Sequence, residues 1–454
     1  MLDKRRAGVL LHPTSLPSGI IGADARRFVD WLSDCGFTVW QVLPLGPPVF
    51  GLSPYSCLSA HAGNTSLVDR QGVVETDATG LKTFEQFIEE HKSWLNDYAL
   101  FVALKTKFKG APWWEWPKDY KLRKPETLHN AHRTLSSVIQ AQKYSQFVFF
   151  HAWCAIKRYA NDKGVKIFGD MPIYVAQDSA EVWLYPELFK LHKEGDRQLM
   201  PSVVAGVPPD YFSETGQLWG NPIYDWNAHE SDGFRWWIAR IAGQLELFDS
   251  IRIDHFRGFE AYWEVPADAD TAQAGQWVKA PGDVLLQTLR DTFHDLPIVA
   301  EDLGMITREV EGLRDRFGLP GMKVLQFAFD GDDSNPYLLK NHVENCVVYT
   351  GTHDNDTTRS WFYALEKDKQ QHVLDVINAR KETMPWALIE QAFASIANLA
   401  VIPMQDVLGL GGNARMNRPG TLEGNWQWRF HWDELSEEVT MRCHSWITEH
   451  GRLT

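Results

Sequence analysis

Three strand-end carboxylates are the residues of this chain with the clearest capacity for chemistry. Asp254 closes the apolar run SIRID, Glu301 closes PIVAE, and Asp354 follows CVVYTGTH. A strand buried on both faces of a parallel sheet reads as a continuous apolar run, and a charge marks the point where it emerges. Since the chemistry of such folds gathers at the carboxyl ends of the strands, we expect these three side chains on one rim.

The chemistry that fits this set is cleavage of a glycosidic bond. A retaining mechanism needs one carboxylate as nucleophile and a second carboxyl group as acid and then base. Arg252 lies two residues before Asp254, so both point to the same side of a strand, where the guanidinium keeps the aspartate ionised. Glu301 follows the apolar residues 298–300, and partial burial there raises its pKa toward the range of an acid catalyst. Asp354 could then hold the hydroxyls of the sugar ring.

Structural roles compete with these assignments. Arg252 and Asp254 could form a plain ion pair inside a barrel layer. Glu301, followed by Asp302, could serve a turn or a helix cap. His353, which precedes the third carboxylate, could be a structural histidine whose hydrogen bonds are satisfied. Each alternative explains one cluster, whereas glycosidic chemistry explains all of them together.

A metal site is another explanation for clustered Asp, Glu and His side chains, because these are hard ligands. However, the chain has no H-E-x-x-H, HxH or EF-hand pattern. We therefore expect no metal and no other cofactor, since each step of glycosidic exchange is an acid–base step.

Eight apolar segments are the candidate strands that position these residues. They are 7–13, 37–44, 165–172, 250–255, 297–302, 322–329, 346–353 and 398–406. Eight is the number that a closed parallel barrel requires. Amphipathic helices are expected between several of them, over 25–36, 233–248, 283–295 and 307–318. This alternation predicts an α/β fold of the (β/α)8 TIM-barrel type, with 1–454 as a single catalytic barrel.

Two connections are far longer than a crossover needs. Residues 45–164, after the second strand, contain SPYS and a helical hairpin predicted from 83–108 and the stretch around 126–161. Residues 173–249, after the third strand, contain a Gly- and Pro-rich segment, 206–222, that is predicted to be a mobile loop. Both insertions leave from carboxyl ends of strands, so we expect them to wall the face that carries the carboxylates.

Charge and cysteine usage limit the partners and the compartment. The net charge of −14 argues against nucleic acid and anionic membranes, which are bound through excess Lys and Arg. The five cysteines are scattered and without a C-x-x-C pair, which indicates reduced thiols. The apolar stretch 7–11 is too short for a signal sequence, and no run approaches the roughly 18 apolar residues of a membrane span. We therefore expect a cytoplasmic protein, as a monomer or a homodimer.

Tryptophan is used heavily, with 20 residues, many of them in polar or Pro-rich stretches such as 111–120, 216–227 and 423–432. For any single tryptophan, core and loop packing is the better interpretation. Collectively, indole faces beside Asn, Asp and Gln suit sugars, which stack on aromatic rings and hydrogen-bond to amides and carboxylates.

Long motifs along nearly the whole chain carry a resemblance to a known family. They include GVLLHPTSLPSG (8–19), WQVLPLGPP (40–48), SPYS (53–56), FGDMPIYVA (168–176), GVPPDYFSETGQLWGNPIYDW (206–226), RIDHFRGF (252–259), AEDLG (300–304) and YTGTHDNDT (349–357). With these motifs the chain resembles the 4-α-glucanotransferases called amylomaltase or disproportionating enzyme, which are relatives of the α-amylases.

The resemblance implies a role for each motif residue. It implies Asp254 as nucleophile, Glu301 as acid and base, and Asp354 as stabiliser of the transition state. For substrate binding it implies Arg252, His353 and His12 around the transferred sugar, Tyr55 as a stacking platform, Asp210, Ser213 and Trp219 along the cleft, and Asn425 in the C-terminal loop.

The function implied is transfer of α-1,4-glucan segments between maltooligosaccharides by double displacement. The nearest alternative is an α-1,4-glucan hydrolase of the amylase type, which would use the same three carboxylates with water as acceptor. A non-catalytic glycan-binding protein is an alternative of another class. It would explain the tryptophans but not the three carboxylates.

Overall fold

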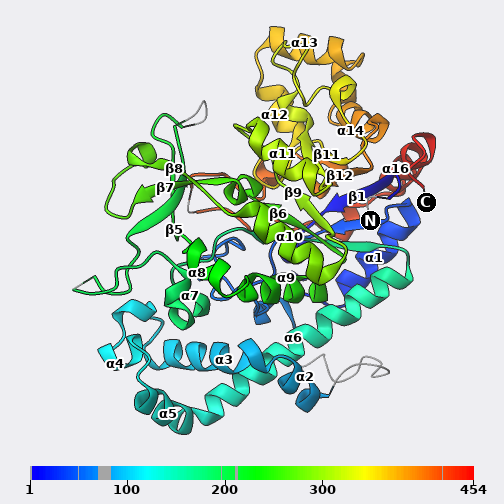
Figure 1. Ribbon diagram of the computed structural model, residues 1–454. Coiled ribbons are helices and arrows are strands. Elements are labelled where there is room, and N and C mark those ends of the chain that lie inside the picture. The colour runs from blue at the N-terminus through cyan, green and yellow to red at the C-terminus, as the bar shows by residue number, and fades with distance from the viewer. Residues whose placement is uncertain are drawn as a thin grey trace.

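A computed structural model describes residues 3–49, 51–69, 83–195, 197–209, 213–421 and 423–453 of the protein. Its central element is a sheet of eight parallel strands (Figure 1). In spatial order the strands are β10 (Gly321–Val324), β11 (Cys346–Tyr349), β12 (Leu399–Pro403), β1 (Arg6–Leu10), β2 (Val39–Gln41), β3 (Lys166–Pro172), β6 (Ser250–Asp254) and β9 (Ile298–Ala300). The N–H of Ala300 donates to the carbonyl of Pro320 over 2.8 Å, which joins β9 to β10. The predicted (β/α)8 barrel is thereby confirmed, with strands shorter than their apolar runs.

Side chains of the strands alternate between the barrel interior and the surrounding helices. The interior cluster includes Leu10, Val39, Phe168, Val299, Met322, Val324, Val347, Tyr349, Leu399 and Val401. Intervening residues such as Val9, Trp40 and Ile251 belong to the larger cluster that packs against the helices. Asp170 follows Phe168 by two residues and lies opposite Arg252 in the β3–β6 register. The same alternation therefore directs both charged residues into the barrel interior.

The four predicted barrel helices are present as α1 (Ala23–Cys35), α9 (Arg235–Leu247), α10 (Gly282–Phe293) and α11 (Arg308–Arg316). In α1, Phe28, Leu32 and Cys35 are buried on one face. The helix ends where Gly36 adopts a left-handed conformation, with φ of +85°. No helix within the described ranges combines the length and apolar character that crossing a bilayer needs.

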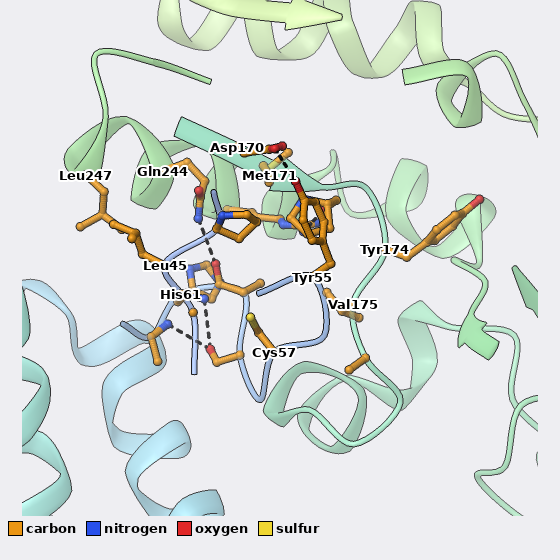
Figure 2. A pocket seen from close by; sticks show the side chains of 18 of the residues that line it. Leu45, Tyr55, Cys57, His61, Asp170, Met171, Tyr174, Val175, Gln244 and Leu247 are labelled. Carbon is orange, nitrogen blue, oxygen red and sulfur yellow. Dashed lines mark hydrogen bonds between the residues drawn. The ribbon is translucent and has the colours of Figure 1, made fainter. Parts of the chain in front are cut away.

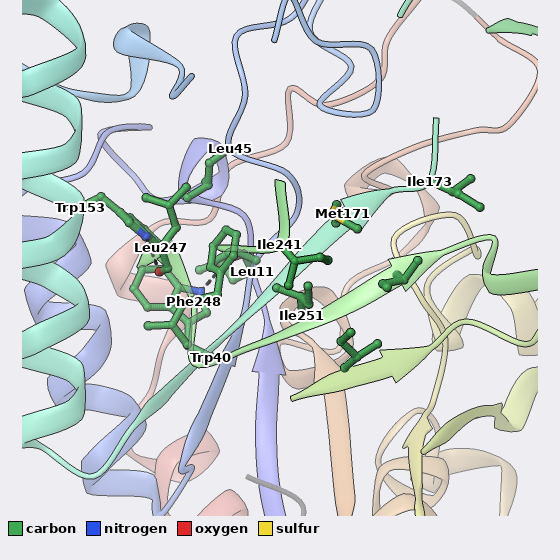
Figure 3. Packing of buried hydrophobic residues seen from close by; sticks show 14 of the residues in the cluster. Leu11, Trp40, Leu45, Trp153, Met171, Ile173, Ile241, Leu247, Phe248 and Ile251 are labelled. Carbon is green, nitrogen blue, oxygen red and sulfur yellow. Dashed lines mark hydrogen bonds between the residues drawn. The ribbon is translucent and has the colours of Figure 1, made fainter. Parts of the chain in front are cut away.

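Aromatic packing attaches the barrel to α6 (Ser136–Asp162) and α9 (Figure 3). The indole N–H of Trp153, from α6, donates to the carbonyl of Leu247 over 2.9 Å. Phe248 packs so closely on β3 that a Cβ atom at Gly169 would lie 2.2 Å from its ring. Glycine at this position of the FGDMP motif is therefore required by packing and not by backbone conformation.

The connection between β2 and β3 is largely helical, as Figure 1 shows at the bottom of the view. It contains α2 (Phe84–Glu90), α3 (Lys92–Lys107), α4 (Lys118–Lys121), α5 (Pro125–Thr134) and α6. Helices α3 and α6 pack against each other, which gives the helical pair predicted from the sequence.

The connection between β3 and β6 differs from its prediction. The segment 206–222 was expected to be a loop, but its two ends belong to β4 (Val203–Val207) and β5 (Gln217–Pro222). These strands join β7 (Ala261–Pro266) and β8 (Gln276–Lys279) in an antiparallel sheet of order β5-β4-β7-β8. The strands form because residues of β4 pair with β7, which lies about sixty positions later in the chain. A local sequence pattern cannot predict pairing with so distant a segment. Mobility of this segment stays a prediction.

Candidate active site

A cleft of about 1050 Å³ opens over the carboxyl ends of the barrel strands. Its walls come from the barrel rim, the insertion after β2, the β4–β5 hairpin and the C-terminal loop around Asn417 and Trp426. Seven of the eleven predicted site residues line it, namely Tyr55, Trp219, Arg252, Asp254, Glu301, His353 and Asp354. The structure therefore brings the three predicted carboxylates together on one rim.

Arg252 is the centre of the charged network at the floor of this cleft. Its Nη1 donates to both carboxylate oxygens of Asp170, over 2.9 and 2.7 Å, and its Nη2 donates to Asp254 Oδ1 over 2.9 Å. Asp170 also accepts the hydroxyl of Tyr55 over 2.7 Å, and Figure 2 shows these two side chains turned toward each other. The Arg252–Asp254 ion pair, considered above as a structural alternative, thus exists. Asp170 orients the guanidinium that holds Asp254, because it accepts two hydrogen bonds from Arg252.

Glu301 has a different environment from Asp254. Its carboxylate accepts the backbone N–H groups of His255 and Leu303, over 2.7 and 2.9 Å. Burial raises the pKa of Glu301 to about 7, the charge of Asp254 adds to this rise, and the Arg252 guanidinium and the two N–H groups oppose it. A large fraction of Glu301 is therefore protonated at neutral pH, as a general acid requires. The predicted rise in its pKa agrees with this geometry.

Asp354 is held from two sides. Its Oδ1 accepts the amide of Asn417 over 2.6 Å, and its Oδ2 lies 3.4 Å from His353 Nε2. The side chain of Asp354 is 48% exposed, and its partial desolvation in the cleft would raise its pKa, but His353 and Asn417 outweigh this effect and hold the pKa well below its usual range. Conversely, burial disfavours the charged imidazolium of His353, and Asp354 overcomes that effect and raises the pKa of the histidine. Asp354 is thus a stably ionised carboxylate at the cleft surface.

Aromatic rings line the cleft beside these charges. Tyr55 stacks on His353, with ring centroids 5.1 Å apart and an interplanar angle of 18°. Trp426 lies 5.9 Å from Tyr55, and Trp219 meets His255 edge-on at 4.8 Å. Trp219 is 37% exposed, so part of its indole is free to contact a ligand. Flat apolar faces next to carboxylates are what binding of a sugar requires.

His12 is not among the described residues that line the cleft. His12 is buried at the end of β1, and burial lowers its pKa to about 3, with the charge of His353 contributing. It therefore lies next to the site without lining it, as a neutral imidazole at physiological pH. Asp210 lies outside the described residues.

Ser213 and Asn425 form loop contacts and do not line the cleft. The hydroxyl of Ser213 donates to the carbonyl of Gly216 over 2.7 Å, within the β4–β5 hairpin. Asn425 donates to Thr421 and accepts the N–H of Arg418, and in this way it shapes the loop that presents Trp426. Their predicted contacts with substrate stay predictions.

Asp170, Asn417 and Trp426 are site residues that were not identified from the sequence. The sequence did contain a signal for Asp170. It is a charged residue within an apolar strand, two residues after Phe168, and this spacing directs it to the same interior face of the barrel. The sequence contained no such signal for Asn417 and Trp426, because they come from an irregular C-terminal loop that reaches the segment of Asp354, after β11, only in the folded chain.

The fold and the carboxylates define a class, the (β/α)8 enzymes that act on glycosidic bonds. The sequence profile of the family described as 4-alpha-glucanotransferase matches residues 11–81 and 71–436. A 4-alpha-glucanotransferase of Thermus thermophilus is 47% identical over 99% of both chains, and one of Synechocystis is 46% identical over 100% of this chain and 99% of its own. The solved structure of an amylomaltase from Streptococcus agalactiae in complex with acarbose superimposes with a TM-score of 0.93 at 37% identity, covering 99% of this chain and 100% of its own.

The chain belongs to the 4-α-glucanotransferase family. The predicted resemblance and the predicted enzyme class are thereby confirmed. The individual roles of the site residues stay predictions.

Proposed function

We propose that the enzyme transfers α-1,4-glucan segments between maltooligosaccharides by a retaining double displacement. In the first step, a carboxylate oxygen of Asp254 bonds to the anomeric carbon of the donor. The glycosidic C–O bond breaks, and the leaving oxygen takes the proton of Glu301. The products are a glucan with a free 4-hydroxyl and a glycosyl ester of Asp254.

The second step reverses these roles. Glu301, now a carboxylate, removes the proton from the 4-hydroxyl of an acceptor glucan, whose oxygen bonds to the anomeric carbon while the ester to Asp254 breaks. Esterification of Asp254 removes the negative charge that helps to raise the pKa of Glu301. The pKa of Glu301 therefore falls in the intermediate, which favours its change from acid to base.

The observation that carries this proposal is the contrast between two neighbouring carboxyl groups. Asp254 receives a charge-assisted hydrogen bond from Arg252, whereas Glu301 is partly buried and its pKa is raised to about 7. Environments that differ in this way assign the nucleophile to one group and the acid to the other. Asp354 supports the reaction as an ionised partner for ring hydroxyls.

Maltotriose as the sole substrate separates the three candidate functions. Transfer predicts glucose and longer oligomers while the total of reducing ends stays constant. A steady rise in reducing ends would indicate an amylase-type hydrolase, and no change in chain length would indicate a glycan-binding protein. Chromatography of the oligomers, combined with a reducing-end assay, measures both quantities in one reaction.

The pH dependence follows from the protonation of Glu301. Because the acid must carry its proton in the free enzyme, kcat/KM for donor cleavage should fall as pH rises through about 7. A maltosyl fluoride donor serves as control, since fluoride leaves with little help from an acid and the fall should largely vanish. A flat profile with maltotriose up to pH 9 would contradict the assignment of Glu301.

The choice between sugar and water depends in this proposal on the β4–β5 hairpin. Trp219, on β5, presents a partly exposed indole beside His255, where it can stack on an acceptor glucan and exclude water. Trp219→Ala should raise the ratio of hydrolysis to transfer several-fold. Trp277→Ala is the matched control, because Trp277 is 39% exposed on β8 of the same small sheet and is not a cleft residue. Equal ratios of hydrolysis to transfer in the two variants would contradict this role of Trp219.

The cellular setting is also a proposal. The five cysteines are free, which fits a reducing cytoplasm. The net charge of −14 supports neutral α-glucans as the main partners in place of nucleic acid. A monomer or a homodimer stays the prediction for the oligomeric state.

A further inference from the structure

His255, the residue that follows Asp254, has an unusual backbone conformation. Its φ and ψ are +54° and +50°, which lie in the left-handed region. Residues other than glycine rarely adopt this conformation, because the Cβ atom crowds the following carbonyl oxygen. Such residues persist where the surrounding structure holds them, and they gather at functional sites. The reaction described above gives His255 no role that would account for its conformation.

Three hydrogen bonds join the chain around His255 to Glu301. The backbone N–H of His255 donates to Glu301 Oε2 over 2.7 Å. The N–H of Phe256 donates to the carbonyl of Glu301 over 3.2 Å, and the N–H of Glu301 donates to the carbonyl of Ile253 over 3.1 Å. At His255 the chain leaves β6 and enters a short 3₁₀ helix, Phe256–Phe259. The turn at His255 therefore holds the carboxylate of Glu301 as well as its backbone.

The imidazole of His255 is not the group that acts on Glu301. Burial lowers the pKa of His255 to about 4, while Asp254 opposes this effect and Arg257 adds to it, so the ring is neutral at physiological pH. Its Nε2 is buried and has no hydrogen bond within the described part of the chain. The ring meets the indole of Trp219 edge-on, with centroids 4.8 Å apart. The ring thus serves packing, and the backbone N–H is what reaches Glu301.

Few other groups influence the charge of Glu301. Among the described residues, the charged and titratable groups that face its carboxyl group are Arg252, Asp254 and the phenol of Tyr337. Asp302 is turned away and pairs with Arg314. The N–H groups of His255 and Leu303 donate to the carboxylate itself. Since a donated hydrogen bond stabilises the ionised form, both N–H groups lower the pKa of Glu301 against the rise that burial causes.

We propose that His255 is a positioning residue for the acid–base steps: its left-handed backbone directs an N–H at Glu301 Oε2, which orients the carboxyl group and stabilises its ionised form. The inference rests on the proposed function, because it takes Glu301 as the acid and base. One residue thereby joins the strand that carries the nucleophile to the group that protonates the leaving oxygen.

An ester in place of the peptide bond tests this role directly. Cell-free translation with a chemically acylated tRNA introduces the α-hydroxy analogue of histidine at position 255, which keeps the imidazole and removes the N–H. Loss of one donor should move the fall of kcat/KM to higher pH by about one pH unit. The ratio of kcat/KM for maltotriose at pH 8 to that at pH 6 should then rise from about 0.1 to about 0.5. A lower yield of folded enzyme would not change this ratio.

Two controls separate the N–H from the ring and from the chemistry of the ester. His255→Asn removes the imidazole but keeps the N–H, and asparagine tolerates the left-handed conformation. Its ratio should equal that of the unaltered enzyme. His294 is the matched control position, because it is an exposed histidine at the end of α10, with φ of +61°, and lies outside the cleft lining. The same ester at position 294 should leave the ratio unchanged.

An unchanged ratio in the enzyme with the ester at position 255 would overturn the proposal. An equal rise in His255→Asn would also overturn it, since the effect would then belong to the imidazole. Failure of the proposed function has a different signature. The unaltered enzyme would show a ratio near one, because no acid loses its proton between pH 6 and 8, and the positioning role of His255 would fall with it.

Discussion

Asp254→Asn is expected to lower kcat for glucan transfer by about 10⁴-fold or more, because loss of a covalent nucleophile has effects of this order. The amide keeps the shape of the side chain and can still meet Arg252 Nη2, so folding should be preserved. It cannot form the glycosyl ester, and no other group occupies its position in the proposed reaction. Initial rates with maltotriose and thermal unfolding of both proteins measure the two quantities.

A control carboxylate and a second active-site variant sharpen this result. Asp315→Asn changes an exposed aspartate on α11, paired with Arg314, and should leave kcat unchanged. Glu301→Gln should lower kcat by about 10²–10⁴-fold with maltotriose, the range of general acid–base catalysis. The loss should be smaller with maltosyl fluoride, which needs no acid for its first step. Near-full activity of a folded Asp254→Asn enzyme would refute the assignment of the nucleophile.

Arg252→Met should lower the free energy of unfolding by about 3–5 kcal/mol, the usual effect of breaking a buried ion pair from one side. Arg252 is 5% exposed and Asp170 is 1% exposed, so the variant leaves Asp170 as a buried carboxylate without its cation. Transfer should also fail, since Asp254 loses the donor that orients it. Urea unfolding followed by tryptophan fluorescence measures the stability.

Two further variants separate the buried pair from a general charge effect. Arg316→Met breaks an exposed ion pair with Asp283 and should change the free energy of unfolding by no more than about 1 kcal/mol. In the double variant Asp170→Leu/Arg252→Met, the stranded carboxylate is gone, so part of the stability should return while activity stays absent. Equal losses in Arg252→Met and Arg316→Met would show that Arg252 is not the buried centre of the network.

The barrel was predictable because each of its strands is encoded locally. Runs such as SIRID and CVVY are buried on both faces, and parallel strands of this kind can be recognised without knowledge of their neighbours. The β4–β5 hairpin was not predictable in the same manner. Its Gly- and Pro-rich sequence resembles a loop, and it becomes a sheet only because β7 supplies hydrogen-bond partners from a later part of the chain.

The site was predictable to the extent that its residues end strands. Asp254 is the last residue of β6 and Glu301 follows β9 directly, so their position on the rim follows from the fold. Asp170 was overlooked, although the alternation of β3 places it inside the barrel, because its importance arises from Arg252, which lies 82 residues later. Asn417 and Trp426 reach the cleft by irregular chain, where no periodicity predicts which side chains turn inward.

The most direct test of the central claim is to trap the glycosyl ester. Glu301→Gln enzyme, mixed with maltosyl fluoride and quenched in acid within milliseconds, should carry one maltosyl group. Peptide mapping by mass spectrometry should place it on Asp254, and the Asp254→Asn/Glu301→Gln enzyme should carry none. Adduct on another residue, or turnover of the fluoride without any adduct in Glu301→Gln, would contradict the double displacement through Asp254.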